Sequence, residues 1–374
     1  MKKPQSPFPV TAYYGPEYFC DRDNEMDRLM SNIQGGNSTS LVALRRLGKT
    51  ALIKHLFHHL GSAYIRIYMD ILPTESLNDM LNSLTTAISS TYPENSSLGK
   101  KAWNLIKTLR PVITFDALSG LPQVSIKATP DESRTTISEL LAFLEKQSKP
   151  VVIAIDEFQQ ILDYPEKQTD AWLRSLMQNL NNVSFIFSGS QQHLMADMFT
   201  NPGRPFFRST QFLKMGKLNG KSYRDFILKK FRDHGRTVSE EIVEDILEWA
   251  DFYTYYVQLL CNRIYLSAGK KITSEKWKDE ADKILKEQEF VFYGYRDMLT
   301  QPQWELLKAV AAEGKVYQPT SYEFISGHRL GNPATVLRSL KSLQGKELIY
   351  REIDESGDSY YSIYDILFAR WVAR

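Results

Sequence analysis

Cysteine and long apolar runs are scarce in this sequence. Its 374 residues contain only two cysteines, Cys20 and Cys261, too few for a disulfide framework, so we expect a reducing compartment. No apolar run approaches the ~20 residues of a membrane-spanning helix. The lysines near the N-terminus are not followed by the apolar segment of a secretory signal. These absences predict a cytoplasmic protein that has no membrane partner.

An excess of charge of one sign is also lacking. Lysine and arginine number 46 and aspartate and glutamate 44, so the formal net charge is +2. Bulk charge therefore cannot hold this chain on nucleic acid or an anionic membrane, and only a local patch could do so. At ~150 residues per domain, the length predicts two or three domains. The hydrophobic content of 43% is ordinary for globular proteins and excludes wholesale disorder.

Short apolar runs alternate with longer stretches of helical spacing in the N-terminal half. The run at 151–155 (VVIAI) is apolar at every position, as in a strand that is buried on both faces. This order predicts an α/β fold, in which a parallel sheet carries helices on both faces. The expected strands are 40–44, 63–71, 151–155 and 183–187, the expected helices are 49–60 and 76–90, and an inserted hairpin is expected within 111–129.

A phosphate-binding motif follows the first expected strand. Residues 43–50 (ALRRLGKT) match the P-loop pattern G-x-x-x-x-G-K-[ST] except at the first position, where Ala43 replaces glycine. Loop N–H groups would surround phosphate oxygens, Lys49 would reach the β- and γ-phosphates, and Thr50 would bind Mg²⁺. An ordinary basic turn is the alternative. The expected nucleotide contacts are Ala43, Arg45, Arg46, Leu47, Gly48, Lys49, Thr50 and Ala51.

Two carboxylates follow the strand expected at 151–155. Asp156 and Glu157 lie where open α/β sheets bind ligands, at the carboxyl end of a buried strand. Asp156 suits a contact to Mg²⁺, and Glu157 suits general-base or water-orienting work on the γ-phosphate. The alternative is that Asp156 merely caps the helix expected to follow it.

Further catalytic candidates follow the strand expected at 183–187. Ser188, Gly189 and Ser190 end this strand, and Ser188 is the candidate for sensing the γ-phosphate or the attacking water. Turn chemistry explains the same residues equally well. Arg204 or Arg208 could place a guanidinium on a γ-phosphate, and Arg208 is the catalytic candidate of the two. For at least one of the two arginines we expect an ordinary surface ion pair instead.

The pattern changes twice in the C-terminal half. Residues 221–269 have helical periodicity almost throughout, and a charged helix is expected at 274–289. A helix from 301, a second helix from 333 and a hairpin around 354–358 (DESGD) then follow the winged-helix plan. We therefore expect a P-loop ATPase domain at 1–217, a helical lid domain at 218–300 and a winged-helix domain at 301–374.

These motifs together resemble the archaeal and bacterial ATPase family of the STAND class, relatives of AAA+ proteins. Residues 19–25 (FCDRDNE) look like the family's motif before the first helix, with Asp21 in place of the usual glycine. The stretches 45–50 and 155–159 look like its Walker A and Walker B motifs, 255–261 its lid helix, and 365–371 its closing segment. The resemblance implies an adenine-nucleotide switch with Cys20, Asp21 and Arg22 bordering the adenine. The Gly-x-Pro that precedes the family's lid helix is absent here.

The winged helix invites a DNA-binding hypothesis, with residues 335–344 as the recognition helix. Residues 302–374 hold nine basic and nine acidic residues, however, and the expected wing at 352–358 is acidic. Acidic groups repel the backbone phosphates that a wing would straddle, so we favour a packing module that responds to the ATPase. His55, His58 and His59 lack the acidic pattern of a zinc helix, and we expect no metal ligation from them.

The sequence thus predicts a cytoplasmic ATP-binding switch with ATP or ADP and Mg²⁺ as cofactors. Its catalytic residues would be Glu157, Lys49, Ser188 and Arg208, and its metal ligands Thr50 and Asp156. Slow hydrolysis is implied by the resemblance alone. Two alternatives stay open: a DNA-binding regulator that uses the winged helix, and a non-hydrolysing scaffold. The expected partner is an unknown protein or a second copy of the chain; DNA is not favoured.

Overall fold

The structure is a computed structural model that describes residues 4–92, 96–109, 111–115, 122–267, 269–354 and 356–374. Two compact units emerge from the contacts within it. One is Ala12–Lys217, and the other joins the N-terminal segment up to Thr11 with Leu218–Arg374. Each unit is described by itself below. The division of the chain into three domains stays a prediction.

A parallel sheet of five strands forms the centre of the first unit. The strands lie in the order β2-β5-β6-β1-β7, and every neighbouring pair is parallel. The predicted α/β fold with a parallel sheet is therefore confirmed, and β7 is an edge strand that the sequence pattern did not reveal. The strands are β1 (Thr39–Val42), β2 (Ile65–Asp70), β5 (Val151–Asp156), β6 (Val183–Gly189) and β7 (Gln211–Lys214).

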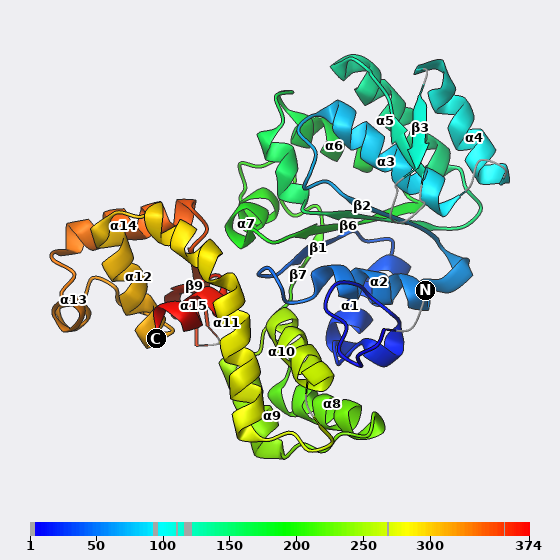
Figure 1. The fold of residues 1–374 in the computed structure, drawn as a ribbon. Helices are drawn as coiled ribbons and strands as arrows, with labels where there is room; N and C mark the ends of the chain where they lie inside the picture. The colour runs from blue at the N-terminus through cyan, green and yellow to red at the C-terminus, as the bar shows by residue number, and fades with distance from the viewer. Residues whose placement is uncertain (1–3, 93–95, 110, 116–121, 268, 355) are drawn as a thin grey trace. The chain divides into compact units, whose positions relative to one another are not determined.

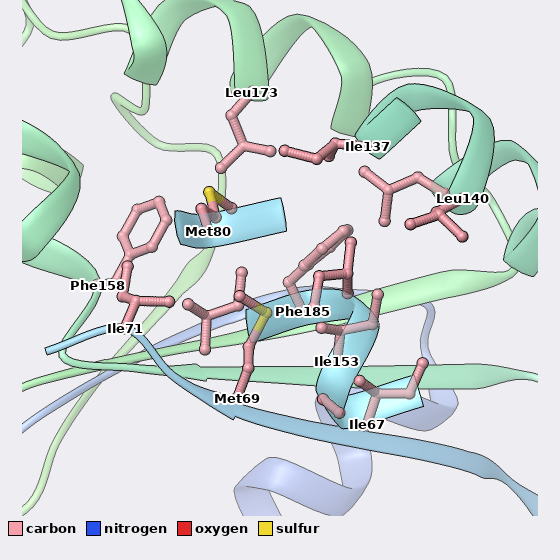
Figure 2. Packing of buried hydrophobic residues seen from close by; sticks show 14 of the residues in the cluster. Ile67, Met69, Ile71, Met80, Ile137, Leu140, Ile153, Phe158, Leu173 and Phe185 are labelled. Atoms are coloured by element: carbon pink, nitrogen blue, oxygen red, sulfur yellow. The ribbon is translucent and has the colours of Figure 1, made fainter. Parts of the chain in front are cut away.

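Helices cover both faces of this sheet (Figure 1). On one face lie α1 (Asp23–Gln34) and α2 (Lys49–Leu60); on the other lie α3 (Leu77–Thr91), α5 (Pro130–Glu145), α6 (Thr169–Met177) and α7 (Gln192–Thr200). Figure 2 shows the core on the second face, where Ile67 and Ile153 from the strands pack under Met80, Leu140 and other helix residues. Neighbouring strand residues such as Val152 and Ala154 are also buried, because the opposite face is covered too.

A small antiparallel hairpin is inserted between α3 and α5. Strands β3 (Val112–Phe115) and β4 (Pro122–Ser125) form a separate two-stranded sheet, which confirms the hairpin expected within 111–129. The Ser119–Gly120 pair proposed for its turn lies outside the described residues. Short helices complete the unit: α4 (Ser97–Ile106), η1 (Pro16–Tyr18), η2 (Gly61–Ala63), η3 (Lys107–Leu109) and η4 (Phe158–Asp163).

The second unit begins with four helices and ends in a winged helix. The first group is α8 (Gly220–Asp233), α9 (Glu240–Trp249), α10 (Thr254–Ser267) and α11 (Ser274–Asp297), and α11 continues past its expected end at residue 289. The winged helix consists of α12 (Gln301–Glu313), α13 (Tyr322–His328), α14 (Pro333–Gly345), β8 (Ile349–Ile353), β9 (Ser359–Ile363) and α15 (Ile366–Val372). The hairpin β8–β9 is antiparallel as expected, whereas α13 was not expected.

Two buried tyrosines, Tyr253 just before α10 and Tyr256 within it, contact the winged helix in this unit. The Tyr253 hydroxyl donates to the Tyr350 hydroxyl over 3.1 Å, and both rings are buried. The Ile366 amide donates to the Tyr256 hydroxyl over 3.2 Å. Buried polar contacts of this kind lose free energy if a partner is withdrawn, so α10 and the winged helix form one packed body. Among the described residues, no helix combines the length and the apolar character needed to cross a bilayer.

The N-terminal segment also packs on this second unit. The Phe8 side chain is fully buried, and its ring centroid lies 4.6 Å from that of Phe231 on α8. The Asn262 side-chain amide of α10 donates to the Phe8 carbonyl over 2.9 Å. The chain therefore passes between the two units twice, once after Thr11 and once after Lys217.

Candidate nucleotide-binding site

The loop between β1 and α2 has the backbone geometry of a phosphate-binding loop. Arg46 has φ of 68° and Gly48 has φ of 97°, a left-handed conformation that glycine adopts without a Cβ clash. Leu47 is buried and anchors the loop, whereas Arg45 and Arg46 are exposed. No side chain caps the N-terminus of α2, so the first-turn N–H groups, including those of Thr50 and Ala51, are suited to receive an anion.

Ala43 occupies the motif position where glycine is usual. Ala43 is fully buried, and its N–H donates to the Gly189 carbonyl over 3.4 Å. It is not among the positive-φ residues of the described chain, so a Cβ at this position causes no left-handed strain. The substitution is therefore compatible with the loop.

Lys49 lies almost fully buried under this loop, with an exposed fraction of 6%. Its ammonium donates to the Ala43 carbonyl over 3.2 Å. Burial lowers the pKa of Lys49, and the nearby carboxylates of Glu157 and Asp156 oppose this shift. A buried ammonium whose hydrogen-bond acceptor among the described residues is a neutral carbonyl is costly, and phosphate oxygens at the loop would supply an anionic acceptor. The residues present therefore fit a nucleotide phosphate.

Asp156 joins the loop to the end of β5. Its Oδ2 atom accepts hydrogen bonds from the Thr50 hydroxyl at 2.7 Å and from the Tyr68 hydroxyl at 2.9 Å. The 3-10 helix η4 begins at Phe158 with Glu157 as its N-cap, and no side chain caps it. The Asp156 carboxylate therefore does not cap η4, which was the alternative role expected for it. A hydroxyl beside a carboxylate is the oxygen set that Mg²⁺ uses together with nucleotide phosphates.

One carboxylate oxygen of Glu157 accepts several hydrogen bonds. Its Oε2 atom accepts hydrogen bonds from the Gln159 amide at 2.7 Å, the Ser190 hydroxyl at 2.7 Å and the Ser190 N–H at 3.2 Å. The Glu157 backbone is left-handed, with φ of 55°, and the next residue, Phe158, is fully buried in an aromatic cluster. The Arg45 guanidinium donates to the Ser190 hydroxyl over 3.3 Å and so links the loop to this group.

The two serines at the end of β6, Ser188 within the strand and Ser190 just after it, differ in their surroundings. Ser188 is fully buried, and its hydroxyl has no hydrogen-bond partner in the described part of the chain. Ser190 contacts Glu157 and Arg45 instead. Sequence reasoning named both positions but selected Ser188, because spacing alone does not show which serine leaves the strand. The catalytic role of Ser188 stays a prediction.

The two candidate arginines lie in the segment that follows α7. Arg208 is exposed and left-handed, with φ of 51°, and its guanidinium lies 5.1 Å from the Phe207 ring centroid. Arg204 forms an ion pair with Asp197 at 2.5 Å, as the surface-pair alternative predicted. Within the described residues, no contact connects Arg208 to the P-loop, and its role at a γ-phosphate stays a prediction.

The segment before α1 reaches the P-loop through Arg22. Arg22 is buried with φ of 78°; it donates to the Glu25 carboxylate at 2.8 Å and to the Leu47 carbonyl at 3.4 Å. Asp21, where the family usually has glycine, has φ of 58° and accepts from the Arg22 N–H. Aspartate tolerates this left-handed conformation better than most residues, which explains the departure. Burial and the neighbouring Asp21 charge raise the pKa of the half-buried Cys20 to about 12.

Sequence reasoning missed two residues on β2. Tyr68 and Asp70 belong to the strand beside β5, and Asp70 pairs in register with Asp156. Burial raises the pKa of Asp70, with smaller contributions from the charges of Asp156 and Glu157, while a hydrogen bond from the Leu72 N–H opposes the shift. Alternation at 63–71 predicted the strand, but its position next to β5 depends on the sheet order.

Comparisons with known proteins agree with this geometry. A family described as a "probable winged helix domain" matches residues 290–374, and a family of ATPase domains found predominantly in Archaea matches residues 19–260. No curated protein matches the chain by sequence.

Solved structures share the fold at low sequence identity. A Walker-type ATPase of Pyrococcus abyssi is 17% identical with a TM-score of 0.68, over 98% of this chain and 100% of that one. The ORC2 protein of Aeropyrum pernix, in ADPNP–ADP complexes, is 11% identical with a TM-score of 0.59, over 99% and 97%. The ORC1 protein of Aeropyrum pernix, in complex with DNA, is 12% identical with a TM-score of 0.52, over 98% and 96%.

The parallel sheet with a phosphate-binding loop between β1 and α2 is the construction of the P-loop ATPases. Because the family match covers more than half of the sequence, the chain belongs to the family of ATPase domains found predominantly in Archaea. It combines this domain with a C-terminal winged helix. Its assignment to the STAND class stays a prediction.

Proposed function

We propose that this chain binds ATP with Mg²⁺ at the P-loop and hydrolyses it slowly, as a nucleotide-dependent switch. One observation carries the proposal: the Thr50 hydroxyl lies 2.7 Å from the Asp156 carboxylate, which joins the two motifs that would bind phosphate and metal. Bound Mg²⁺ would supply charge neutralisation at the phosphates. The family and the ADPNP–ADP complexes of the ORC2 neighbour support the choice of an adenine nucleotide.

Each residue of the site has a defined task in this proposal. Lys49 would hold the β- and γ-phosphates, and the N–H groups from Arg45 to Ala51 would surround them. Thr50 and Asp156 would bind the metal, and Glu157 would take the proton of the attacking water. Cys20, Asp21 and Arg22 would border the adenine, and Ser188 and Arg208 are the remaining catalytic candidates.

The switch would act through the second unit. The chain connects the two units covalently at Thr11–Ala12 and at Lys217–Leu218. The first connection leads within a few residues to Cys20–Arg22, and its other side is anchored by the buried Phe8. A change at the nucleotide would therefore reach the second unit along two chain segments. An unknown protein or a second copy of the chain would receive the signal.

Calorimetry with ATP and ADP, followed by a turnover assay, tests the proposal. The intact protein should bind nucleotide below the millimolar range, and Lys49→Ala should weaken binding by about 100-fold, or ~2.7 kcal/mol. Glu157→Gln should keep binding and lose turnover by about 100-fold or more. Equal binding by Lys49→Ala would refute the site, and undiminished turnover by Glu157→Gln would place the base elsewhere.

A DNA-binding regulator is the second candidate function. Arg338 and Lys341 are exposed on α14, and neither forms an ion pair among the described residues. The ORC1 neighbour was solved in complex with DNA. Against this, Asp354 in the wing accepts hydrogen bonds from Ser356 and Tyr317, which lower the pKa of Asp354 and keep it charged.

Retardation of labelled duplex DNA by the full chain at two salt concentrations separates these functions. DNA binding would weaken steeply with salt and further in an Arg338→Ala/Lys341→Ala variant. Salt-insensitive or absent binding favours the packing module. The third candidate, a non-hydrolysing scaffold, is tested by the nucleotide content of the purified protein. ADP that is retained through purification, together with no turnover, would identify it.

A further inference from the structure

Gln159 is a buried polar residue to which neither the motifs nor the proposed function has given a task. It lies in η4, two residues after Glu157, with an exposed fraction of 4%. Its amide nitrogen donates to Glu157 Oε2 at 2.7 Å, while its own Oε1 is buried and accepts no hydrogen bond within the described residues. Leaving a buried amide oxygen unsatisfied costs free energy, so folding stability alone does not explain a glutamine here.

The backbone of β6 makes room for this side chain. A Cβ on Gly189 would lie 2.5 Å from Gln159 Oε1 and 2.5 Å from the Met195 side chain, closer than real Cβ contacts. Gly189 is not in a left-handed conformation, so close approach, rather than backbone conformation, is what requires glycine at this position. The end of β6 thus admits Gln159 and then supplies Ser190 as the second donor group.

The three hydrogen bonds that the Glu157 carboxylate accepts from described residues all end on one oxygen. Oε2 receives the Gln159 amide, the Ser190 hydroxyl and the Ser190 N–H, whereas no described residue donates to Oε1. An oxygen that already accepts three hydrogen bonds is a poor proton acceptor, so the basic electron pair is left on Oε1. A carboxylate fixed at one oxygen is also restricted in rotation, which lowers the entropic cost of orienting a water.

We propose that Gln159 is a positioning residue that fixes Glu157 by Oε2, so that Oε1 is the atom that takes the proton of the attacking water. The inference rests on the proposed function of Glu157. In this step the water O–H bond breaks, its proton goes to Oε1, and the water oxygen attacks the γ-phosphorus with the electron pair of that bond. The bond between the γ-phosphorus and the β,γ-bridging oxygen breaks, and ADP leaves with its electron pair. In this role Gln159 acts only through Glu157, to which its amide nitrogen donates.

Steady-state turnover and nucleotide affinity of four variants test this role. Gln159→Leu should lower kcat about tenfold and leave the affinity for ATP unchanged, because it disturbs only the orientation of the base. Gln160→Leu is the matched control: Gln160 lies next along η4, but its amide donates to the Thr74 carbonyl at 3.1 Å. In a Glu157→Gln background, Gln159→Leu should have no further effect, because the two residues act as a unit.

An isosteric variant gives a readout that a purely structural role would not change. Gln159→Glu places a second carboxyl beside Glu157. At low pH the pair shares a proton, which replaces the amide hydrogen bond; at high pH both groups are charged and repel one another. The ratio of variant to wild-type kcat should therefore fall as the pH rises from about 6 to about 9. This variant also keeps the test valid if Gln159→Leu does not fold.

The outcomes separate the inference from the proposed function. If Glu157→Gln abolishes turnover while Gln159→Leu behaves like Gln160→Leu, the positioning role is wrong and the catalytic base is right. A pH-independent ratio for Gln159→Glu also overturns the positioning role. If Glu157→Gln retains full turnover, the proposed base itself is wrong, and the role of Gln159 falls with it.

Discussion

The hydroxyl of Thr50 lies 2.7 Å from Oδ2 of Asp156, so the P-loop and the end of β5 meet at one carboxylate. Asp156→Asn keeps an acceptor for Thr50 but removes the negative charge that a metal ion needs. In the presence of Mg²⁺, the variant should therefore bind ATP about tenfold or more weaker than the wild type. In the absence of Mg²⁺, the two proteins should bind ATP equally well.

Titration calorimetry with ATP in the presence and absence of Mg²⁺ measures this difference. Asp163→Asn is the control, because Asp163 is an exposed aspartate at the far end of η4. The metal assignment of Asp156 is wrong if both variants show the same response to Mg²⁺.

Replacing Lys49 should strengthen the fold while it weakens the site. Burial lowers the pKa of Lys49, so the unfolded chain binds its proton more tightly, and this group makes the free energy of unfolding rise with pH toward 10.5. Lys49→Met should therefore raise the free energy of unfolding at pH 7 by about 1 kcal/mol without nucleotide. Chemical denaturation measures it, and Lys54→Met, on the exposed face of α2, is the control.

The N-terminal segment should contribute strongly to the stability of the second unit. Phe8 is fully buried against Phe231, so Phe8→Ala removes a large apolar side chain and leaves a cavity. We expect a loss of about 3–5 kcal/mol. Phe290→Ala is a matched control in the same unit, because Phe290 is 89% exposed and its loss should be nearly neutral. Thermal unfolding that is equally sensitive to both substitutions would contradict the packing of this segment.

His55 should make the protein sensitive to mild acid. Burial lowers the pKa of His55 to about 4, with smaller contributions from His59 and His58, and the ring stacks on Phe19 at 4.0 Å. Because the unfolded ring binds protons from about pH 6.5, stability is complete above that pH and falls progressively down to about pH 4. His55→Gln should reduce the loss between pH 7.5 and pH 5 by roughly 1 kcal/mol, since much of the ring is in solvent.

Unfolding midpoints at pH 7.5 and pH 5 check this effect. His193→Gln serves as the control because His193 is exposed on α7. An acid response that is identical in the two variants would show that His55 is not its source.

Local patterns in the sequence predicted the helices and strands that carry the candidate nucleotide site. A run of β-branched residues predicts a strand whatever surrounds it in space. Likewise, the spacing of apolar residues predicted a helix at 49–60, and Lys49–Leu60 forms it. Asp156 is the last residue of β5 and Glu157 follows it, so the strand places both carboxylates at the carboxyl end of the sheet. These features depend on neighbours within a few residues along the chain, so they can be predicted without knowledge of the tertiary structure.

Local sequence patterns could not predict contacts between residues that are distant along the chain. The spacing at 188–190 could not show that Ser190, and not Ser188, touches Glu157, because residues two apart share one face of a strand. What separates the two serines is that β6 ends at Gly189, between them. Tyr68 was missed because its contact with Asp156 depends on β2 lying next to β5. The short edge strand β7 and helix α13 have too few residues to give a periodic signal.

The sequence by itself determined that this is a P-loop α/β protein with a winged helix, because periodicity and a contiguous motif are local properties of the chain. Only the tertiary structure decided which groups donate hydrogen bonds to the Glu157 carboxylate. The donors are Gln159 and Ser190, and the Gln159 side chain fits there because Gly189 has no Cβ. The tertiary structure also decided that the segment containing Phe8 packs with the C-terminal half. Burial of a ring depends on what surrounds it in space, and that information is spread over the whole chain.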